Sequence, residues 1–361
     1  MKLDINRDLL LVPLSKQVSI TERRSIMPIL SNVLIEFSKN RISLYSTDLE
    51  LSAISHVQHE GTAEKKIVVH GRKFLDILKE MDPETMNFEI KENTLTLTQK
   101  QSEFVLGLQD PEEFPEVKEI AGTQEFNIDG STFLEMLEKV QFAISSDETR
   151  YVLTGMYMMG SDGILSVVGT DGFRMALCRK AIDGLESFKG VIVPKRSILE
   201  IGRVVTEGEV VRIVMGEKHV QFVTGSVVLI SRLIEGGFPD YENVIPKGNS
   251  NVAKVEKTKL LKGLRKVSTI ISKAEPVKIT LRQGAIGIEA ESEVGRAKES
   301  VDATYDGDEL SMNFNVRFVA DVVAHIEQKD ILVSAPSGYG AVLFEGENSE
   351  MYKNIVMPIR V

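Results

Sequence analysis

The sequence predicts an α+β protein built from three copies of one domain, each with two helices packed on antiparallel sheets. Three observations carry this prediction: a helix pattern that occurs three times, a second helix pattern that follows it each time, and short motifs that recur between them. All of them repeat at a spacing of about 120 residues. Several patterns that recur at one spacing indicate a repeat architecture.

The first recurring pattern is an amphipathic helix, expected over residues 6–20, 129–144 and 256–271. Apolar residues at positions i, i+1 and i+4 mark one buried helical face, and a lysine follows two positions later. In the third copy the apolar face continues to Ile271. The matching positions are Leu10, Leu11, Leu14 and Lys16; Phe133, Leu134, Leu137 and Lys139; and Leu260, Leu261, Leu264 and Lys266.

The second pattern is an arginine, any residue, two apolar residues, an acid and another apolar residue. It occurs at 72–77, 196–201 and 317–322, and each copy is expected to open a helix. Strand-like runs with period-2 alternation lie between the helices, among them two predicted hairpins at 93–108 and 219–233. We expect about eight short strands per domain, and turn-rich segments place the domain boundaries at 1–121, 122–248 and 249–361.

Composition narrows the class of protein. The chain has 361 residues, a net charge of −10 and one cysteine, Cys178. One cysteine excludes a disulfide framework within the chain, so a cytoplasmic location is expected. We expect no membrane partner, because no apolar run reaches the length of a membrane span. The acidic total argues against coating nucleic acid by bulk attraction, but it leaves room for a local basic surface.

The sequence offers little that resembles an active site. His56 and His59 are three apart in a strand-like region and would point to opposite faces, so they are interpreted as surface residues and not as metal ligands. Cys178 is expected to be a buried, inert thiol. Asp48 and Asp171 each follow a threonine and are expected to bond the backbone of a tight turn. We predict no catalytic, cofactor or metal site.

Basic residues gather on the recurring helices. A lysine or arginine recurs at equivalent helix positions, while the chain as a whole is acidic, so the charge is segregated. Phosphate-backbone binding is one use of such a surface, and a solubilising helix face is the alternative. Few aromatic residues accompany these cations, which argues against stacking on single-stranded nucleic acid.

The chain resembles one known family, the bacterial DNA polymerase III beta subunit, over essentially its whole length. The stretches that carry the resemblance are 27–37, 46–51, 68–81, 148–156, 168–177, 191–201, 238–247, 314–323 and the end "VMPIRV". The resemblance implies a head-to-tail homodimeric ring that slides on double-stranded DNA without sequence preference. It also implies partner peptides from replicative and other DNA polymerases and from a clamp loader. Twelve helices facing the hole would leave an opening of about 25 Å, enough for a duplex.

The resemblance also implies three sets of site residues. The DNA-facing set is Arg24, Arg72, Lys73, Lys139, Arg196 and Lys266, and the dimer interface is Phe104, Leu106, Ile270 and Ile271. The partner-peptide pocket is Leu153, Thr170, Gly172, Arg174, Met175, Pro239, Val244, Tyr339, Met357, Pro358, Ile359 and Arg360. Burial within a domain is the competing explanation for the apolar members.

The sequence departs from the family at a few positions. Glu242 and Asn243 stand where arginines are common, and Phe173 stands where a histidine is common. Asp147 is an acid in a loop that can offer an uncharged DNA contact, so that contact is not carried over. Two alternatives stay open here: a repeat-built interaction scaffold that does not act on DNA, and a nucleotide-processing enzyme.

Overall fold

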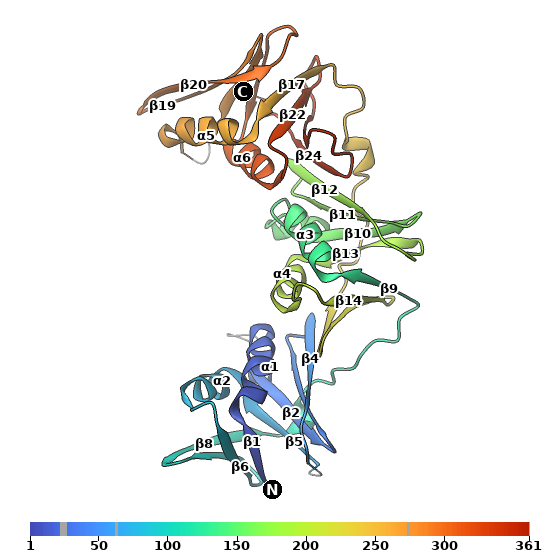
Figure 1. The fold of residues 1–361 in the computed structure, drawn as a ribbon, viewed down its shortest axis with the longest axis vertical. Helices are drawn as coiled ribbons and strands as arrows, with labels where there is room; N and C mark the ends of the chain where they lie inside the picture. The colour runs from blue at the N-terminus through green and yellow to red at the C-terminus, as the bar shows by residue number, and fades with distance from the viewer. Residues whose placement is uncertain (22–26, 62–63, 273–274, 361) are drawn as a thin grey trace. The chain divides into compact units, whose positions relative to one another are not determined.

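The computed structural model describes residues 1–21, 27–61, 64–272 and 275–360. Figure 1 draws these residues as a ribbon coloured from the N-terminus to the C-terminus. Contacts between residues divide the chain into two compact units. Unit 1 is Met1–Phe133 with Arg196–Leu233, and unit 2 is Leu134–Lys195 with Ile234–Val361. The units therefore divide the second predicted repeat between them. Among the described residues, no helix is long and apolar enough to cross a membrane.

Both recurring helix patterns form helices. The first pattern gives α1 (Arg7–Ile20), α3 (Gly130–Gln141) and α5 (Lys257–Val267), and the second gives α2 (Gly71–Glu80), α4 (Lys195–Val204) and α6 (Val316–His325). Side chains of Asn6 and Asn315 accept hydrogen bonds from the first turns of α1 and α6, which satisfies backbone donors there. The predicted continuation of α5 to Ile271 is wrong, because the α-helix ends at Val267 and a short 3₁₀ turn follows.

Unit 1 contains one twelve-stranded antiparallel sheet, in the order β1-β6-β7-β8-β5-β2-β3-β4-β16-β15-β14-β9. The predicted hairpins at 93–108 and 219–233 are β7–β8 and β15–β16. The strands are β1 (Lys2–Asn6), β2 (Asn32–Ser38), β3 (Arg41–Thr47), β4 (Leu51–Gln58), β5 (Lys65–His70), β6 (Thr85–Ile90), β7 (Thr94–Gln99), β8 (Ser102–Gln109), β9 (Gln124–Asp129), β14 (Val210–Met215), β15 (His219–Thr224) and β16 (Val227–Arg232).

Unit 2 contains a second twelve-stranded antiparallel sheet, in the order β13-β10-β11-β12-β24-β23-β22-β17-β20-β19-β18-β21. The strands are β10 (Gly155–Ser161), β11 (Ile164–Thr170), β12 (Arg174–Ala181), β13 (Phe188–Pro194), β17 (Asn251–Glu256), β18 (Val277–Arg282), β19 (Ala285–Ser292), β20 (Gly295–Thr304), β21 (Leu310–Phe314), β22 (Asp330–Ala335), β23 (Val342–Gly346) and β24 (Tyr352–Val356). Short 3₁₀ turns are η1 (Pro28–Ser31), η2 (Pro111–Glu113), η3 (Glu148–Leu153), η4 (Glu242–Val244) and η5 (Ser268–Ile270).

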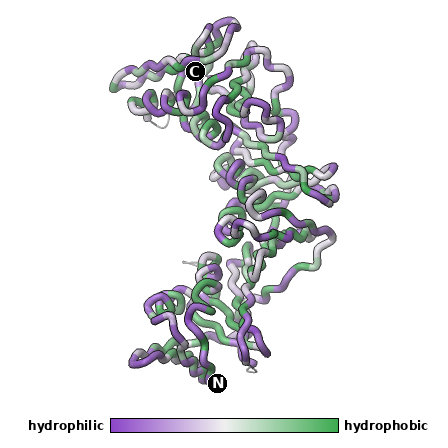
Figure 2. The backbone as a smooth tube through the Cα atoms, in the orientation of Figure 1, coloured by the Kyte–Doolittle hydropathy of each residue, from purple (hydrophilic) through white to green (hydrophobic). Residues whose placement is uncertain are grey.

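The core of unit 1 shows why the apolar helix positions matter. Leu10 and Leu14 of α1 are fully buried with Phe74 of α2 in one cluster. The ring of Phe74 meets Phe88 of β6 edge to face, with centroids 6.2 Å apart. Hydrophobic and hydrophilic residues alternate along these elements in Figure 2, as expected for helices and strands with one buried face. Apolar burial on this scale is the main stabilising contribution to such a fold.

Candidate functional site

A tight turn of unit 2 joins β11 to β12. The carboxylate of Asp171 accepts hydrogen bonds from the backbone N–H groups of Phe173 and Arg174, both at 2.9 Å. Asp48 accepts equivalent bonds from Glu50 and Leu51 in unit 1, at 2.9 and 2.7 Å. The predicted structural role of both aspartates is therefore confirmed.

Gly172 lets the side chain of Arg150 lie against this turn. It has a φ of +85°, and a Cβ there would stand 2.6 Å from Nη1 of Arg150. That nitrogen donates to the carbonyl of Asp171 at 2.8 Å. The guanidinium also covers the ring of Phe173 at 4.8 Å, and Phe173 is half exposed. Glycine at 172 is thus required both by the backbone conformation and by the packing of Arg150.

Arg174 ties the turn to helix α6 and to the end of α3. Its guanidinium pairs with Asp171 at 3.1 Å and with Asp321 of α6, and it donates to the carbonyl of Phe142 at 2.7 Å. It also covers the ring of Phe318 at 4.5 Å. Only 11% of the Arg174 side chain is exposed. Each of its three guanidinium nitrogens therefore already has a partner within unit 2.

A groove with a cavity of about 110 Å³ opens beside this turn. Its floor is apolar and buried, with Met175 and Ile355 among the buried residues, while Phe173 and Val244 at its rim are exposed. Burial raises the pKa of Tyr241, another lining residue, so the phenol stays neutral. The lining residues are Leu153, Thr170, Gly172, Phe173, Arg174, Met175, Phe238, Pro239, Tyr241, Val244, Ile355 and Met357.

The end of the chain meets this groove at Met357, which is one of its lining residues. The backbone of Met357 donates to the carbonyl of Phe173 at 2.8 Å, and Ile359 donates to that of Asn313 at 2.7 Å. The hydroxyl of Tyr339 donates to the carbonyl of Pro358 at 2.6 Å. The guanidinium of Arg360 covers the ring of Tyr339 at 4.4 Å. Val361 lies outside the described residues.

The structure brings eight of the twelve predicted pocket residues together around one cavity. Of the other four, Pro358, Ile359 and Arg360 follow Met357 on the tail, and Tyr339, which lies before β23, contacts Pro358 and Arg360. Four further residues line the cavity that are not in the predicted pocket set: Phe173, Phe238, Tyr241 and Ile355. The sequence Phe-Pro-acid occurs at 114–116 and again at 238–240, and this repetition was a signal for one of the four, Phe238.

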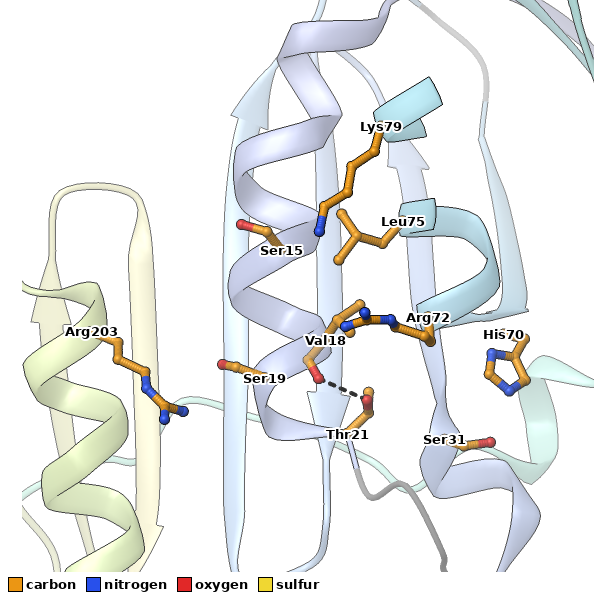
Figure 3. Close-up of a pocket in the computed structure, with 10 residues that line it drawn as sticks. All are labelled: Ser15, Val18, Ser19, Thr21, Ser31, His70, Arg72, Leu75, Lys79 and Arg203. Atoms are coloured by element: carbon orange, nitrogen blue, oxygen red, sulfur yellow. Dashed lines mark hydrogen bonds between the residues drawn. The ribbon is translucent and has the colours of Figure 1, made fainter. Parts of the chain in front are cut away.

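A basic cleft of about 570 Å³ lies in unit 1 between α1 and α2 (Figure 3). Arg72 opens α2 at one side, Lys79 reaches over α1, and Arg203 approaches from α4. Three hydroxyl groups on the α1 side complete the wall of the cleft. Each donates its hydrogen to a backbone carbonyl three residues earlier, so the hydroxyl oxygen can still accept a hydrogen bond. These hydroxyls belong to Ser15, Ser19 and Thr21.

Unit 2 has an equivalent cleft of about 440 Å³ between α5 and α6. Arg317 occupies the position that Arg72 has in unit 1, and Arg265 adds a second cation. Both are exposed, and no ion pair joins either to another described residue. Arg317 is a repeat position in the sequence, but it is not in the predicted DNA-facing set, and neither are Lys79, Arg203 and Arg265.

The predicted DNA-facing residues fall into different environments. Arg72 and Lys73 are exposed at the start of α2, and Arg72 pairs with Asp76 at 3.2 Å. Lys266 pairs with Glu299 at 2.7 Å. Arg24 lies outside the described residues.

The side chains of Arg196 and Lys139 form ion pairs with acidic residues of the chain itself. Arg196 pairs with Asp48 and donates to the carbonyl of Ile20 at 3.0 Å. Lys139 is only 12% exposed. Burial alone would lower the pKa of Lys139, but its hydrogen bonds to Glu135 and Glu327 outweigh burial and raise the pKa. Lys139 therefore stays protonated, and the carboxylates of Glu135 and Glu327 balance its positive charge within unit 2.

The predicted dimer residues lie on two separate surfaces. Phe104 and Leu106 are half-buried on β8 of unit 1, and their side chains share the face that packs on the unit 1 core. Ile270 and Ile271 are half-buried beyond the end of α5 in unit 2.

No group of three or more histidine, cysteine or acidic side chains in the described part of the chain is arranged to hold a metal. The Nδ1 atom of His56 shares a hydrogen bond with the hydroxyl of Ser43. Cys178 is buried, and burial raises its pKa to about 11. The prediction that this thiol is buried is confirmed, and the raised pKa agrees with the predicted lack of reactivity.

Comparisons with known proteins match the chain from end to end. Family models of the DNA polymerase III beta subunit match in order, with the N-terminal domain at 1–118, the central domain at 127–240 and the C-terminal domain at 242–360. The chain is 33% identical to the beta sliding clamp of Pseudomonas putida and 30% identical to that of Caulobacter vibrioides, each over 100% of both proteins. A crystal structure of the DNA polymerase III subunit beta from Pseudomonas aeruginosa is similar with a TM-score of 0.97 and 30% identity, over 100% of both chains.

Proposed function

Because the chain belongs to the DNA polymerase III beta subunit family, the beta sliding clamps, we propose that two copies close head to tail around duplex DNA and that the groove of unit 2 captures polymerase peptides. The chain is a non-catalytic processivity clamp with three clamp domains. Its partners are DNA, DNA polymerases, the clamp loader and a second copy of itself. The domain boundaries 1–121, 122–248 and 249–361 and a cytoplasmic location are part of the proposal.

A ring that holds DNA by topology needs little affinity for it. The net charge of −10 fits this mode, because a strongly basic protein would bind DNA from outside and slide poorly. The two equivalent clefts supply cations where the repeated helices meet. We propose Arg72, Lys79, Arg265 and Arg317 as phosphate contacts, since their side chains line these clefts. We assign Lys139 no DNA contact, because Glu135 and Glu327 neutralise its charge.

The groove suits the apolar anchors of a short peptide. Its floor is buried and apolar, its rim is partly exposed, and hot-spot contacts of peptides concentrate in such desolvated pockets. Met175 and Met357 provide flexible thioether side chains that adapt to anchors of different shape. The observation that carries this proposal is the position of the chain end, where Met357 is fixed to Phe173 as part of the wall.

Retention on circular DNA tests the clamp function. The protein is loaded with its clamp loader on a nicked plasmid and passed through a sizing column, before and after the plasmid is linearised. We expect retention on the circle and release from the linear form. Equal release from both forms would contradict a topological hold.

The DNA contacts are tested by variants in the same assay. The double variant Arg265→Ala with Arg317→Ala should lower loading and its salt resistance, because two phosphate contacts are lost. Lys139→Ala is the matched control and should load normally. Loss of loading in the control alone would overturn the assignment of the clefts.

A further inference from the structure

One wall of the groove in unit 2 carries acidic residues and no basic ones. Residues 234–246 form this wall, which we call the acidic wall, and they contribute the lining residues Phe238, Pro239, Tyr241 and Val244. The segment contains Glu235, Asp240 and Glu242 but no lysine or arginine, and Lys247 follows only after its end. The groove therefore has one acidic side next to its apolar floor.

Asp240 lies between two lining residues and is exposed. Its carboxylate accepts a hydrogen bond from the side-chain amide of Asn243 at 2.6 Å and another from the backbone N–H of Asn243 at 3.4 Å. These donors are neutral, so they orient the carboxylate without cancelling its charge. Glu242, in contrast, forms an ion pair with Arg179 of β12. Within the described residues no ion pair reaches Asp240, and its negative charge stays uncompensated at the rim.

Tyr241 adds a polar group to the same wall. The residue is only 6% exposed, and its hydroxyl has no hydrogen-bond partner among the described residues. A buried hydroxyl without a partner is unfavourable, and most such groups in proteins are satisfied. Because Tyr241 lines the cavity, a ligand with a polar group at this wall can remove that cost, and a purely apolar ligand cannot.

The opposite side of the groove carries a positive charge. Arg150 covers the ring of Phe173, a lining residue, and 41% of the Arg150 side chain is exposed. Its ion pair with Asp147 spans 3.9 Å, which is long for such a contact. A cationic group of a ligand is therefore repelled beside Arg150 and attracted beside Asp240.

We propose that the acidic wall makes the groove selective for a partner peptide with a lysine or arginine next to its apolar anchors, and that Asp240 binds this cation. The inference rests on the peptide-binding function proposed above and adds a charge requirement to it. The anchors enter the cavity, while the basic side chain stays at the rim and donates charge-assisted hydrogen bonds to the carboxylate of Asp240. A glutamate at the same peptide position sets two negative charges against each other.

Three labelled peptides with the same Leu and Phe anchors test this charge requirement by fluorescence anisotropy. They differ at one residue beside the anchors, which is lysine, glutamine or glutamate. The varied residue stands directly before the anchors in one series and directly after them in a second, so both peptide directions are covered. In one of the series we expect the lysine peptide to bind the wild type about twofold to fivefold more tightly than the glutamine peptide, as for an exposed ion pair. The glutamate peptide should bind more weakly than both.

Variants of Asp240 assign the preference to this carboxylate. Asp240→Asn keeps an acceptor for Asn243 and removes the charge, so it should bind the lysine and glutamate peptides equally. It should bind the glutamine peptide as the wild type does, which also shows that the groove is folded. Asp240→Lys should reverse the preference towards glutamate. Glu186→Gln is the matched control, because Glu186 is an exposed acid of unit 2 outside the acidic wall, and it should keep the lysine preference.

The possible results separate this inference from the function on which it rests. If the lysine and glutamate peptides bind the wild type equally in both series, the groove still binds peptides and the charge requirement is wrong. A lysine preference that persists in Asp240→Asn, or that is lost in Glu186→Gln, also overturns the inference. If none of the peptides binds the wild type, the groove assignment fails and this inference fails with it.

Discussion

Arg174 offers the sharpest test of how the groove is held in shape. Its guanidinium is almost fully buried and joins the β11–β12 turn to α6 and to the carbonyl that follows α3. We choose Arg174→Met, which keeps the apolar stem and removes the charge. The Asp171 side chain, which is only 16% exposed, then loses its ion-pair partner. The carbonyl of Phe142 loses its hydrogen-bond donor.

The expected cost is the sum of a few contacts. Leaving Asp171 without its charged partner costs about 1.5–3 kcal/mol, and the unmet Phe142 carbonyl adds about 1 kcal/mol. The cation–π contact with Phe318 adds about 0.5–1 kcal/mol. Asp321 is 46% exposed, so solvent screening limits its part to under about 1 kcal/mol. The local loss should therefore be about 3–5 kcal/mol for Arg174→Met and under about 1 kcal/mol for Asp321→Asn.

Native-state hydrogen exchange measures this loss where it is expected. The amide of Met357 donates to the carbonyl of Phe173, so its protection reports opening of the groove wall. We expect the opening free energy at the Met357 amide to fall by about 3–5 kcal/mol in Arg174→Met and by under about 1 kcal/mol in Asp321→Asn. The opening free energies at amides of the unit 1 core should change little. Binding of a polymerase-derived peptide should weaken in parallel. Equal, small losses in both variants would refute the view that Arg174 fixes the wall.

Three further predictions concern the groove and the thiol. Deleting the last five residues, from Met357 on, should abolish binding of a Gln/Leu/Phe-rich polymerase peptide and leave the dimer intact. Calorimetric titration measures the peptide affinity, and sedimentation measures the dimer. An unchanged peptide affinity would mean that the tail only packs on the core of unit 2. Gly172→Ala should displace Arg150 and cost about 1–2 kcal/mol by hydrogen exchange, whereas Gly208→Ala, another glycine with positive φ but open space, should cost less. Cys178 keeps its proton to about pH 11, while the unfolded thiol ionises near pH 9, so folding stability should fall as the pH rises from 9 to 11. Cys178→Ser should flatten that part of the urea-unfolding profile, and an unchanged slope would contradict it.

The helices and hairpins were predictable because local patterns encode them. Leu10 and Leu14 lie on the buried face that their spacing indicates, and the hairpins keep their period-2 alternation. The end of α5 was not predictable from the apolar spacing. Ile271 fits the helical period, yet it lies beyond a 3₁₀ turn and remains half-buried. Periodicity shows which face is apolar, but it does not show where the backbone leaves the helix.

The groove was predictable only in part, because its walls come from segments far apart in sequence. Gly172 and Met357 were found through the family resemblance, but Tyr241 and Ile355 belong to the lining for reasons of packing. Ile355 sits in β24, and its position opposite Met175 is decided by the register of a junction between repeats. A single sequence gives no direct sign of that register.

The recurring arginine of the second helices shows the limit of reasoning from repeats. Arg72, Arg196 and Arg317 occupy equivalent positions, and basic residues at such positions suggested phosphate binding, although the predicted DNA-facing set held only Arg72 and Arg196 of the three. In the structure Arg72 and Arg317 line open clefts, whereas Arg196 is held by Asp48 and the carbonyl of Ile20. The difference follows from the neighbours, because the helix of Arg196 packs beside the turn of the preceding repeat within unit 1. Reversing the charge of Arg196 should therefore weaken the junction between the first two repeats before it affects DNA.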